Sequence, residues 1–143
     1  MAGITAKEFS FIKNADIRKI LERDHVDLQK CLIAQSWKPA IILAGSGIEA
    51  ILVDVLQAKE TQAKGADAAQ KGNIDAWDLI DLINVAIELK LISEGALKLS
   101  NSVRGYRNLV HPGNEVRNKL KVGKEEATIA FNVLEMVYRD LTT

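Results

Sequence analysis

The chain has 143 residues, of which 48% are hydrophobic and 27% are charged, and its formal net charge at pH 7 is zero. This length and apolar content predict one folded domain over residues 1–143 and exclude a disordered tail. The zero net charge excludes a protein that coats nucleic acid by charge alone.

A predicted arm or short helix over residues 1–13 leads into a long helix. Apolar residues at intervals of three and four predict this helix over about residues 16–35, and Asn14 or Asp16 can cap its start. His25 lies there among charged neighbours, and no second histidine is near it in sequence to complete a metal site. We therefore expect His25 to be a solvent-exposed surface histidine.

A second long helix is predicted over about residues 39–58, with a proline in its first turn. The glycines in residues 45–47 each cost about 1 kcal/mol relative to alanine in a helix. A neighbouring helix packed closely against the bare backbone would offset that cost. Glu49 lies on or beside the packed face, where an isolated charge would be costly to bury. We expect Glu49 either to pair with Arg104 or Arg107, or to point into solvent at the edge of the face.

Cys31, the single cysteine, lies on the apolar side of the first long helix. A small buried thiol is expected there, not a nucleophile. One cysteine can form no internal disulfide, which indicates a reducing compartment. Glu49 and Asp54 interrupt the apolar stretch at residues 40–56, so we predict a buried core helix in a cytoplasmic protein with no membrane association.

Two segments separate the helix predicted over residues 39–58 from the polar and cationic residues described next. Residues 57–73 lack any large apolar residue and predict a frayed helix end that runs into a mobile loop. A third helix is predicted from near Asp75, and it is apolar on most sides. Such breadth predicts burial against more than one partner, for which a homodimer interface is a reasonable candidate. Trp77 is expected to anchor the core, with that interface as the alternative.

Ser93 can cap a fourth predicted helix, which carries the residues best able to do chemistry. At about 100° of rotation per residue, four polar or cationic residues lie within roughly 60° of one another on it. These residues are Ser100, Arg104, Arg107 and His111. The apolar stripe that would face the core consists of Leu99, Val103, Tyr106 and Val110. Pro112 and Gly113 are expected to end the helix.

The last predicted helix runs from about Lys124 to Leu141 and follows a cationic connection. Within residues 101–124, one acid, Glu115, opposes a set of cations. The cations are Arg104, Arg107, Arg117, Lys119, Lys121 and Lys124. No stretch alternates with a two-residue period over the length of a strand. The expected fold is all-α, an up-and-down bundle of four main helices plus a short additional helix.

Residues 106–113 read Tyr-Arg-Asn-Leu-Val-His-Pro-Gly. Together with the five-helix pattern around them, they resemble the HEPN superfamily (higher eukaryotes and prokaryotes nucleotide-binding), small all-α domains of which many are ribonucleases. The family motif is an arginine, four to six intervening residues and a histidine near the end of a late helix. Arg104 and His111 have six residues between them, whereas Arg107 has three. Arg104 is therefore the better match, although Gly105 stands where the family usually has a polar residue.

The resemblance implies an RNA-binding protein or a metal-independent endoribonuclease, such as the toxin of a toxin–antitoxin or defence system, with its active site at a homodimer cleft. Histidine suits proton transfer near neutral pH, and arginine grips phosphate oxygens with two hydrogen bonds. In this interpretation the catalytic pair is Arg104 and His111. The residues expected to bind phosphate or RNA are Arg107, Asn108, Lys119 and Lys121, and the supporting residues are Glu49, Ser100 and Tyr106. No cofactor or metal is expected.

Three alternatives stay open. The chain could be a catalytically inactive HEPN-like module that binds protein or nucleotide, a purely structural helical dimer, or a toxin silenced by an antitoxin such as a minimal nucleotidyltransferase. HEPN toxins controlled by nucleotide transfer carry a tyrosine two residues after the histidine, whereas this chain has Gly113, which disfavours that form of control. Two histidines, one cysteine and no glycine fingerprint give little basis for zinc enzymes, Ser-His-Asp hydrolases or dinucleotide folds.

Overall fold

The computed structural model describes residues 3–99 and 103–143, and these residues are helical or irregular with no strand. Three long helices dominate, and they are α1 (Ala15–Ile33), α2 (Trp37–Gln57) and α7 (Lys124–Thr142). The shorter α-helices are α3 (Glu60–Lys64), α4 (Leu79–Glu88), α5 (Gly95–Leu99) and α6 (Pro112–Arg117). The 3₁₀ helices in the described part are η1 (Ile74–Ala76) and η3 (Tyr106–Val110). The all-α prediction is confirmed, but helices other than α1, α2 and α7 are shorter and more numerous than expected.

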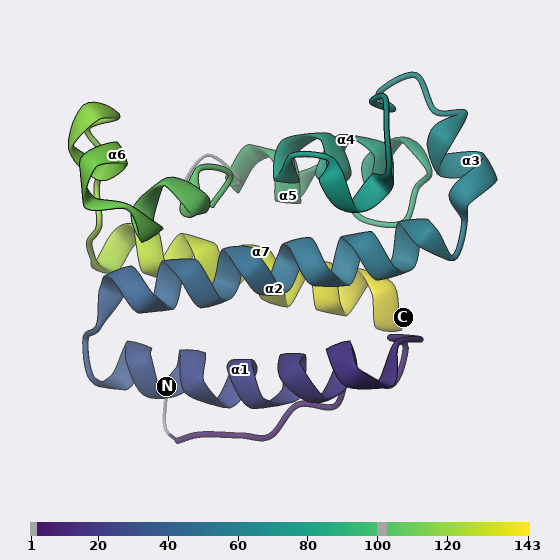
Figure 1. The fold of residues 1–143 in the computed structure, drawn as a ribbon. Coiled ribbons are helices and arrows are strands. Elements are labelled where there is room, and N and C mark those ends of the chain that lie inside the picture. The colour runs from purple at the N-terminus through teal and green to yellow at the C-terminus, as the bar shows by residue number, and fades with distance from the viewer. Residues whose placement is uncertain (1–2, 100–102) are drawn as a thin grey trace.

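Helix α2 lies at the centre of the molecule (Figure 1). It contacts α1 on one side, α7 along its length, and α4 and η3 on the side away from α1. It is long and apolar enough to cross a membrane by length and composition, a test that core helices also pass. Ile48, Ile51 and Leu52 are completely buried within this fold, as the prediction of a core helix requires.

Helices α1 and α2 run antiparallel and are joined by a short turn (Figure 1). The predicted start of α1 is confirmed, because the Asn14 side chain accepts hydrogen bonds from the backbone N–H groups of Asp16 and Ile17. Asp54 of α2 accepts further hydrogen bonds from the backbone N–H groups of Lys13 and Asn14, at 3.0 and 3.2 Å. The start of α1 is thereby fixed to the C-terminal half of α2.

Residues 57–73 contain the short helix α3, where the sequence predicted only a frayed helix end and a loop. Ala63 is fully buried although it is small, so the segment does contribute to the core. Glu88 of α4 accepts hydrogen bonds from the backbone N–H groups of Asp67 and Ala68, at 2.7 and 3.0 Å. These contacts attach the segment to α4, and its mobility stays a prediction.

The third predicted helix begins four residues later than expected, at Leu79 instead of Asp75, because Ile74–Ala76 forms η1 and Trp77 and Asp78 are extended. Trp77 is 2% exposed and belongs to the core, which confirms the simpler of its two predicted roles. The broad apolar surface of α4 is buried against α2 and α5 of the same chain. A dimer is therefore not needed to bury it.

Candidate functional site

The motif region is divided into short pieces and does not form the single helix that the sequence predicted. Helix α5 ends at Leu99, and Ser100, a predicted supporting residue, lies outside the described residues. Residues 103–105 form a turn that leads into η3. Backbone N–H groups here bond three residues back, from Tyr106 to Val103 O and from Asn108 to Gly105 O, each at 3.0 Å. The expected α-helical geometry is therefore wrong in this segment.

A 3₁₀ helix repeats every three residues, so side chains three apart share a face. Val103, Tyr106 and Leu109 are buried at this spacing. Val110 was predicted to face the core, but it is 55% exposed, and Leu109 replaces it. The change of helical period is the physical reason for this correction.

The same change of period affects the polar residues. Arg104 and Arg107 are both exposed, three positions apart. His111 is also exposed, but it follows the end of η3 with φ of −113° and ψ of 113°, which is extended backbone. The predicted stripe that joined these three residues on one α-helical face is therefore not formed. What remains is a short segment with two exposed arginines before an exposed histidine.

His111 is the residue that caps the start of α6. Its backbone carbonyl accepts hydrogen bonds from Asn114 N at 2.9 Å and Glu115 N at 3.1 Å. Pro112 was expected to end a helix, but it occupies the first position of α6. Proline suits that position because its missing N–H would have no partner there and its fixed φ fits a helix. Lys38 Nζ forms an ion pair with Glu115 Oε1 at 2.8 Å, and this contact connects α6 to the start of α2.

Glu49 of α2 joins η3 to the central helix. Arg107 Nη2 donates to Glu49 Oε1 at 2.6 Å, and the Tyr106 hydroxyl donates to Glu49 Oε2 at 3.0 Å. This confirms the ion pair, one of the two expectations for Glu49, and its partner is Arg107. The hydrogen bond to Glu49 raises the pKa of Arg107 further above its ordinary value. The pKa of Tyr106 is raised, because the effect of burial exceeds that of a hydrogen bond with Arg107, which lowers this pKa.

Gly45 provides the space for this arrangement. A Cβ atom at Gly45 would lie 2.5 Å from Tyr106 Cδ1 and 2.8 Å from Tyr106 Cβ. A Cβ at Gly47 would meet Leu134 only at 3.7 Å, an ordinary contact distance. The predicted close approach to the glycines of α2 is therefore confirmed at Gly45, and the element that approaches is η3.

The remaining predicted phosphate ligands continue along the same stretch of chain. Asn108 is half-buried in η3, whereas Lys119 and Lys121 are exposed in the connection between α6 and α7. Lys119 has a φ of 50°, in the left-handed region, at the turn that follows α6. Exposed cations therefore lie on both sides of the exposed His111 in sequence.

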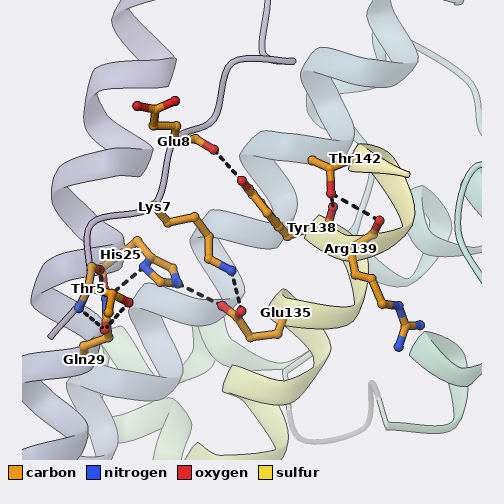
Figure 2. Close-up of polar contacts among 9 residues, drawn as sticks. All are labelled: Thr5, Lys7, Glu8, His25, Gln29, Glu135, Tyr138, Arg139 and Thr142. Carbon is orange, nitrogen blue, oxygen red and sulfur yellow. Dashed lines mark hydrogen bonds and ion pairs between the residues drawn. The ribbon is translucent and has the colours of Figure 1, made fainter. Parts of the chain in front are cut away.

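A second polar cluster, which the sequence analysis missed, surrounds His25 (Figure 2). His25 is 4% exposed, so the prediction of a surface histidine is wrong. Its Nε2 lies 2.8 Å from Oε1 of Glu135 on α7, and its Nδ1 lies 3.0 Å from Nε2 of Gln29. The sequence spacing could have predicted this burial, because His25 lies four residues after Leu21 and three before Leu28, on the buried face of α1.

Backbone groups fix the orientation of the Gln29 amide, and with it the proton on His25. Gln29 Oε1 accepts from Thr5 N at 2.9 Å, and Gln29 Nε2 donates to Thr5 O at 2.7 Å. The amide nitrogen therefore faces Nδ1 of His25, which must accept, and Nε2 carries the proton that is donated to Glu135. Both ring nitrogens are thus engaged, and the imidazole is not arranged as a general base or a metal ligand.

Lys7 completes the cluster from the N-terminal side. Its Nζ lies 2.5 Å from Glu135 Oε2 and 4.1 Å from the centre of the Tyr138 ring. Burial alone would raise the pKa of Glu135, but hydrogen bonds from His25 and Lys7 outweigh burial and hold this pKa below its ordinary value. Glu135 is therefore an ionised acceptor shared by α1 and the N-terminal segment.

Over the described ranges, no group of three or more histidine, cysteine, aspartate or glutamate side chains is arranged to hold a metal ion. Comparison of the chain with models of protein families, with curated proteins and with solved structures gives no match.

The Cys31 thiol is half-buried. Burial raises its pKa most, and the negative charge of Asp27 raises it further. A raised pKa disfavours the thiolate, in agreement with the expectation that Cys31 is not a nucleophile.

Proposed function

We propose that this chain is a HEPN-like RNA-binding protein that cleaves RNA without a metal when two copies bring their motif segments together. One observation carries the proposal. Arg104, Arg107 and His111 are all exposed within eight residues of chain. Exposed Val110 lies within that stretch, and exposed Val116 follows five residues after it. Cations and an imidazole bind and transform phosphates, and exposed apolar side chains beside them favour contact with a protein surface.

The exposed valines are the reason for including a second copy. Val116 is 77% exposed on α6, and Val110 is more than half exposed directly before His111. RNA cleavage needs a base for the 2′-hydroxyl and an acid for the leaving oxygen, whereas the motif segment of one chain contributes a single histidine. Two copies that meet through these valines would contribute one His111 each and supply both groups.

The arginines take different roles in this proposal. Arg107 is held by Glu49 at 2.6 Å, so it is positioned by the core and has the remaining N–H groups of its fork for a phosphate. Arg104 lies one 3₁₀ turn earlier, is exposed, and matches the spacing of the family motif to His111. Arg104 and His111 are therefore the proposed catalytic pair, and Lys119 and Lys121 would bind the RNA strand by charge.

Cleavage of single-stranded and structured RNA by the purified protein, without added metal, tests this proposal. We expect the double variant Arg104→Ala/His111→Ala to lose cleavage with an unchanged helical circular dichroism spectrum. The matched control is Arg23→Ala, which removes an exposed arginine on α1 far from the motif in sequence. Equal cleavage by the native chain and the double variant would refute the proposed site.

A binding module without turnover is the second candidate, and a specific observation favours it. Arg104 and His111 are separated by a turn and a 3₁₀ helix, so they do not share the regular helical face on which the family motif is usually presented. RNA binding that falls with rising salt, without cleavage by the native chain, would identify this form. An antitoxin partner remains part of either form, and Gly113 disfavours control by nucleotide transfer.

A further inference from the structure

A cavity outside the motif region lies beside the His25 cluster. Its volume is about 940 Å³. Ligand pockets for small molecules typically measure about 300–1,000 Å³. The walls are α1, the start of α2, α7 from Lys124 to Glu135, and an N-terminal strap that we define as residues 3–9. This cavity is not used by the proposed function.

The strap is held in place, so this wall of the cavity is formed before any ligand arrives. Gln29 makes two hydrogen bonds to the backbone of Thr5. Lys7 binds Glu135, and the Tyr138 hydroxyl donates to the carbonyl of Glu8 at 2.7 Å (Figure 2). A preformed wall lowers the ordering cost of binding.

Apolar side chains form much of the lining. Trp37 and Phe131 contribute aromatic rings, and Leu32 and Ile33 contribute aliphatic groups from the end of α1. Ile33 and Ile4 line the cavity and are also exposed, which places them at its opening. An apolar ring or short chain would bury itself against this surface.

The charged side chains that line the cavity indicate which sign of charge a ligand would carry. His25 and Gln29 use their polar atoms on each other, on Thr5 and on Glu135, so they offer little to a ligand. Glu135 is neutralised by Lys7 at 2.5 Å. Lys124 lines the cavity as well and is exposed. The lining therefore carries two lysines against one carboxylate and favours an anion.

We propose that this cavity binds a small organic carboxylate with an apolar body. The carboxylate pairs with Lys124, and Lys7 lies in the same lining, where its ammonium group is shared with Glu135. The apolar body lies against Trp37, Phe131 and Ile33. This inference goes beyond the proposed function, because it concerns a different surface and a ligand without phosphate.

The test uses the full chain and three probes that share one body: phenylpropanoate, phenylpropylamine and phenylpropanol. Calorimetry measures binding, and fluorescence reports it at Trp37, since the other tryptophan, Trp77, is buried in the core. We expect saturable binding of phenylpropanoate, about tenfold tighter than binding of the amine, a ratio that corresponds to about 1.4 kcal/mol. Lys124→Gln should weaken phenylpropanoate about threefold and leave phenylpropanol unchanged, as expected for one exposed ion pair.

Lys19→Gln is the matched control, since Lys19 is an exposed lysine on α1 outside the cavity lining. It should leave the affinity for all three probes unchanged. Absence of saturable phenylpropanoate binding would overturn the inference. So would binding of the amine as tight as that of the carboxylate, or equal affinities in the native chain and Lys124→Gln. No assay here contains RNA, so failure leaves the proposed RNA site untouched, and failure of the RNA assay leaves this cavity untouched.

Discussion

Gly45 is the residue on which the position of η3 depends. The Tyr106 ring occupies the space where a side chain at this position would begin. In return, the Tyr106 hydroxyl reaches Glu49 on the next turn of α2, and Arg107 reaches the same carboxylate. A helix interior tolerates glycine at a cost of about 1 kcal/mol, and here the close contact with η3 offsets it.

Gly45→Ala is therefore expected to lower the free energy of unfolding by about 2 kcal/mol, because overpacking forces the Tyr106 ring to move. Gly47→Ala is the matched control, two residues away in the same helix. Its Cβ would meet side chains only at ordinary distances, so alanine should raise stability by about 0.5–1 kcal/mol through better helix propensity. Urea unfolding of both variants measures the difference. Equal stabilities would mean that Tyr106 does not pack on the backbone of α2 as described.

Glu135 joins three parts of the chain: α7, α1 through His25, and the N-terminal strap through Lys7. Its pKa is held below the ordinary value of 4.5, so the folded state binds this proton more weakly than the unfolded state does. The stability that Glu135 contributes is therefore fully present above the ordinary pKa and is lost as pH falls through the lower, folded value.

Glu135→Gln should cost about 1–2 kcal/mol of unfolding free energy at neutral pH, since it removes one charge-assisted acceptor that serves two donors. The deficit relative to the native chain should be constant above about pH 5 and should shrink in more acidic solution. Thermal unfolding followed at a series of pH values measures it. Glu8→Gln, at an exposed position in the same strap, controls for the removal of a carboxylate as such. A deficit that grows on acidification would contradict the described role of Glu135.

The long helices were predictable because their burial repeats with the α-helical period. Asn14 caps α1 as expected, and the predicted bounds of α2 and α7 differ from those observed by at most two residues. The ion pair between Glu49 and an arginine of the motif region was one of two alternatives that the sequence left open. Each of these features follows from local spacing or from the cost of an unpaired buried charge.

The motif region was not predictable from the same reasoning, because its period is three residues and not 3.6. The shorter period moves the buried position by one residue, from the predicted Val110 to Leu109. Pro112 predicts the end of a helix, but proline also favours the first position of a helix, which it occupies in α6. The local sequence does not distinguish these two uses. The geometry of Arg104 and His111 depends on both points.

The His25 cluster was missed for a different reason. Its acceptor, Glu135, lies 110 residues further along the chain, and its other partners lie on α1 and in the N-terminal strap. Charged neighbours in sequence suggested exposure, whereas the leucines three and four residues away place His25 on the buried face. Contacts between distant segments decide the environment of such a residue, and sequence spacing alone does not provide them.

Two of the large apolar side chains that are exposed in the described part of the chain bear on self-association. Val110 and Val116 both belong to the η3–α6 segment, beside the proposed catalytic histidine. The segment is joined to α2 by the Glu49–Arg107 and Lys38–Glu115 ion pairs, so it is a fixed part of the surface. A second copy bound there would bring two motif segments together.

Val110→Glu tests this arrangement, because a glutamate buried without a partner in an interface costs several kcal/mol. We expect the native chain to have the mass of a dimer by light scattering, and the variant to be a monomer that no longer cleaves RNA. Arg104→Ala should remain a dimer while losing cleavage, which separates association from chemistry. Ile20→Glu is the matched control, since Ile20 is a similarly exposed apolar residue on α1. A Val110→Glu protein that is still dimeric and fully active would show that the two copies, if they meet, do so through another surface.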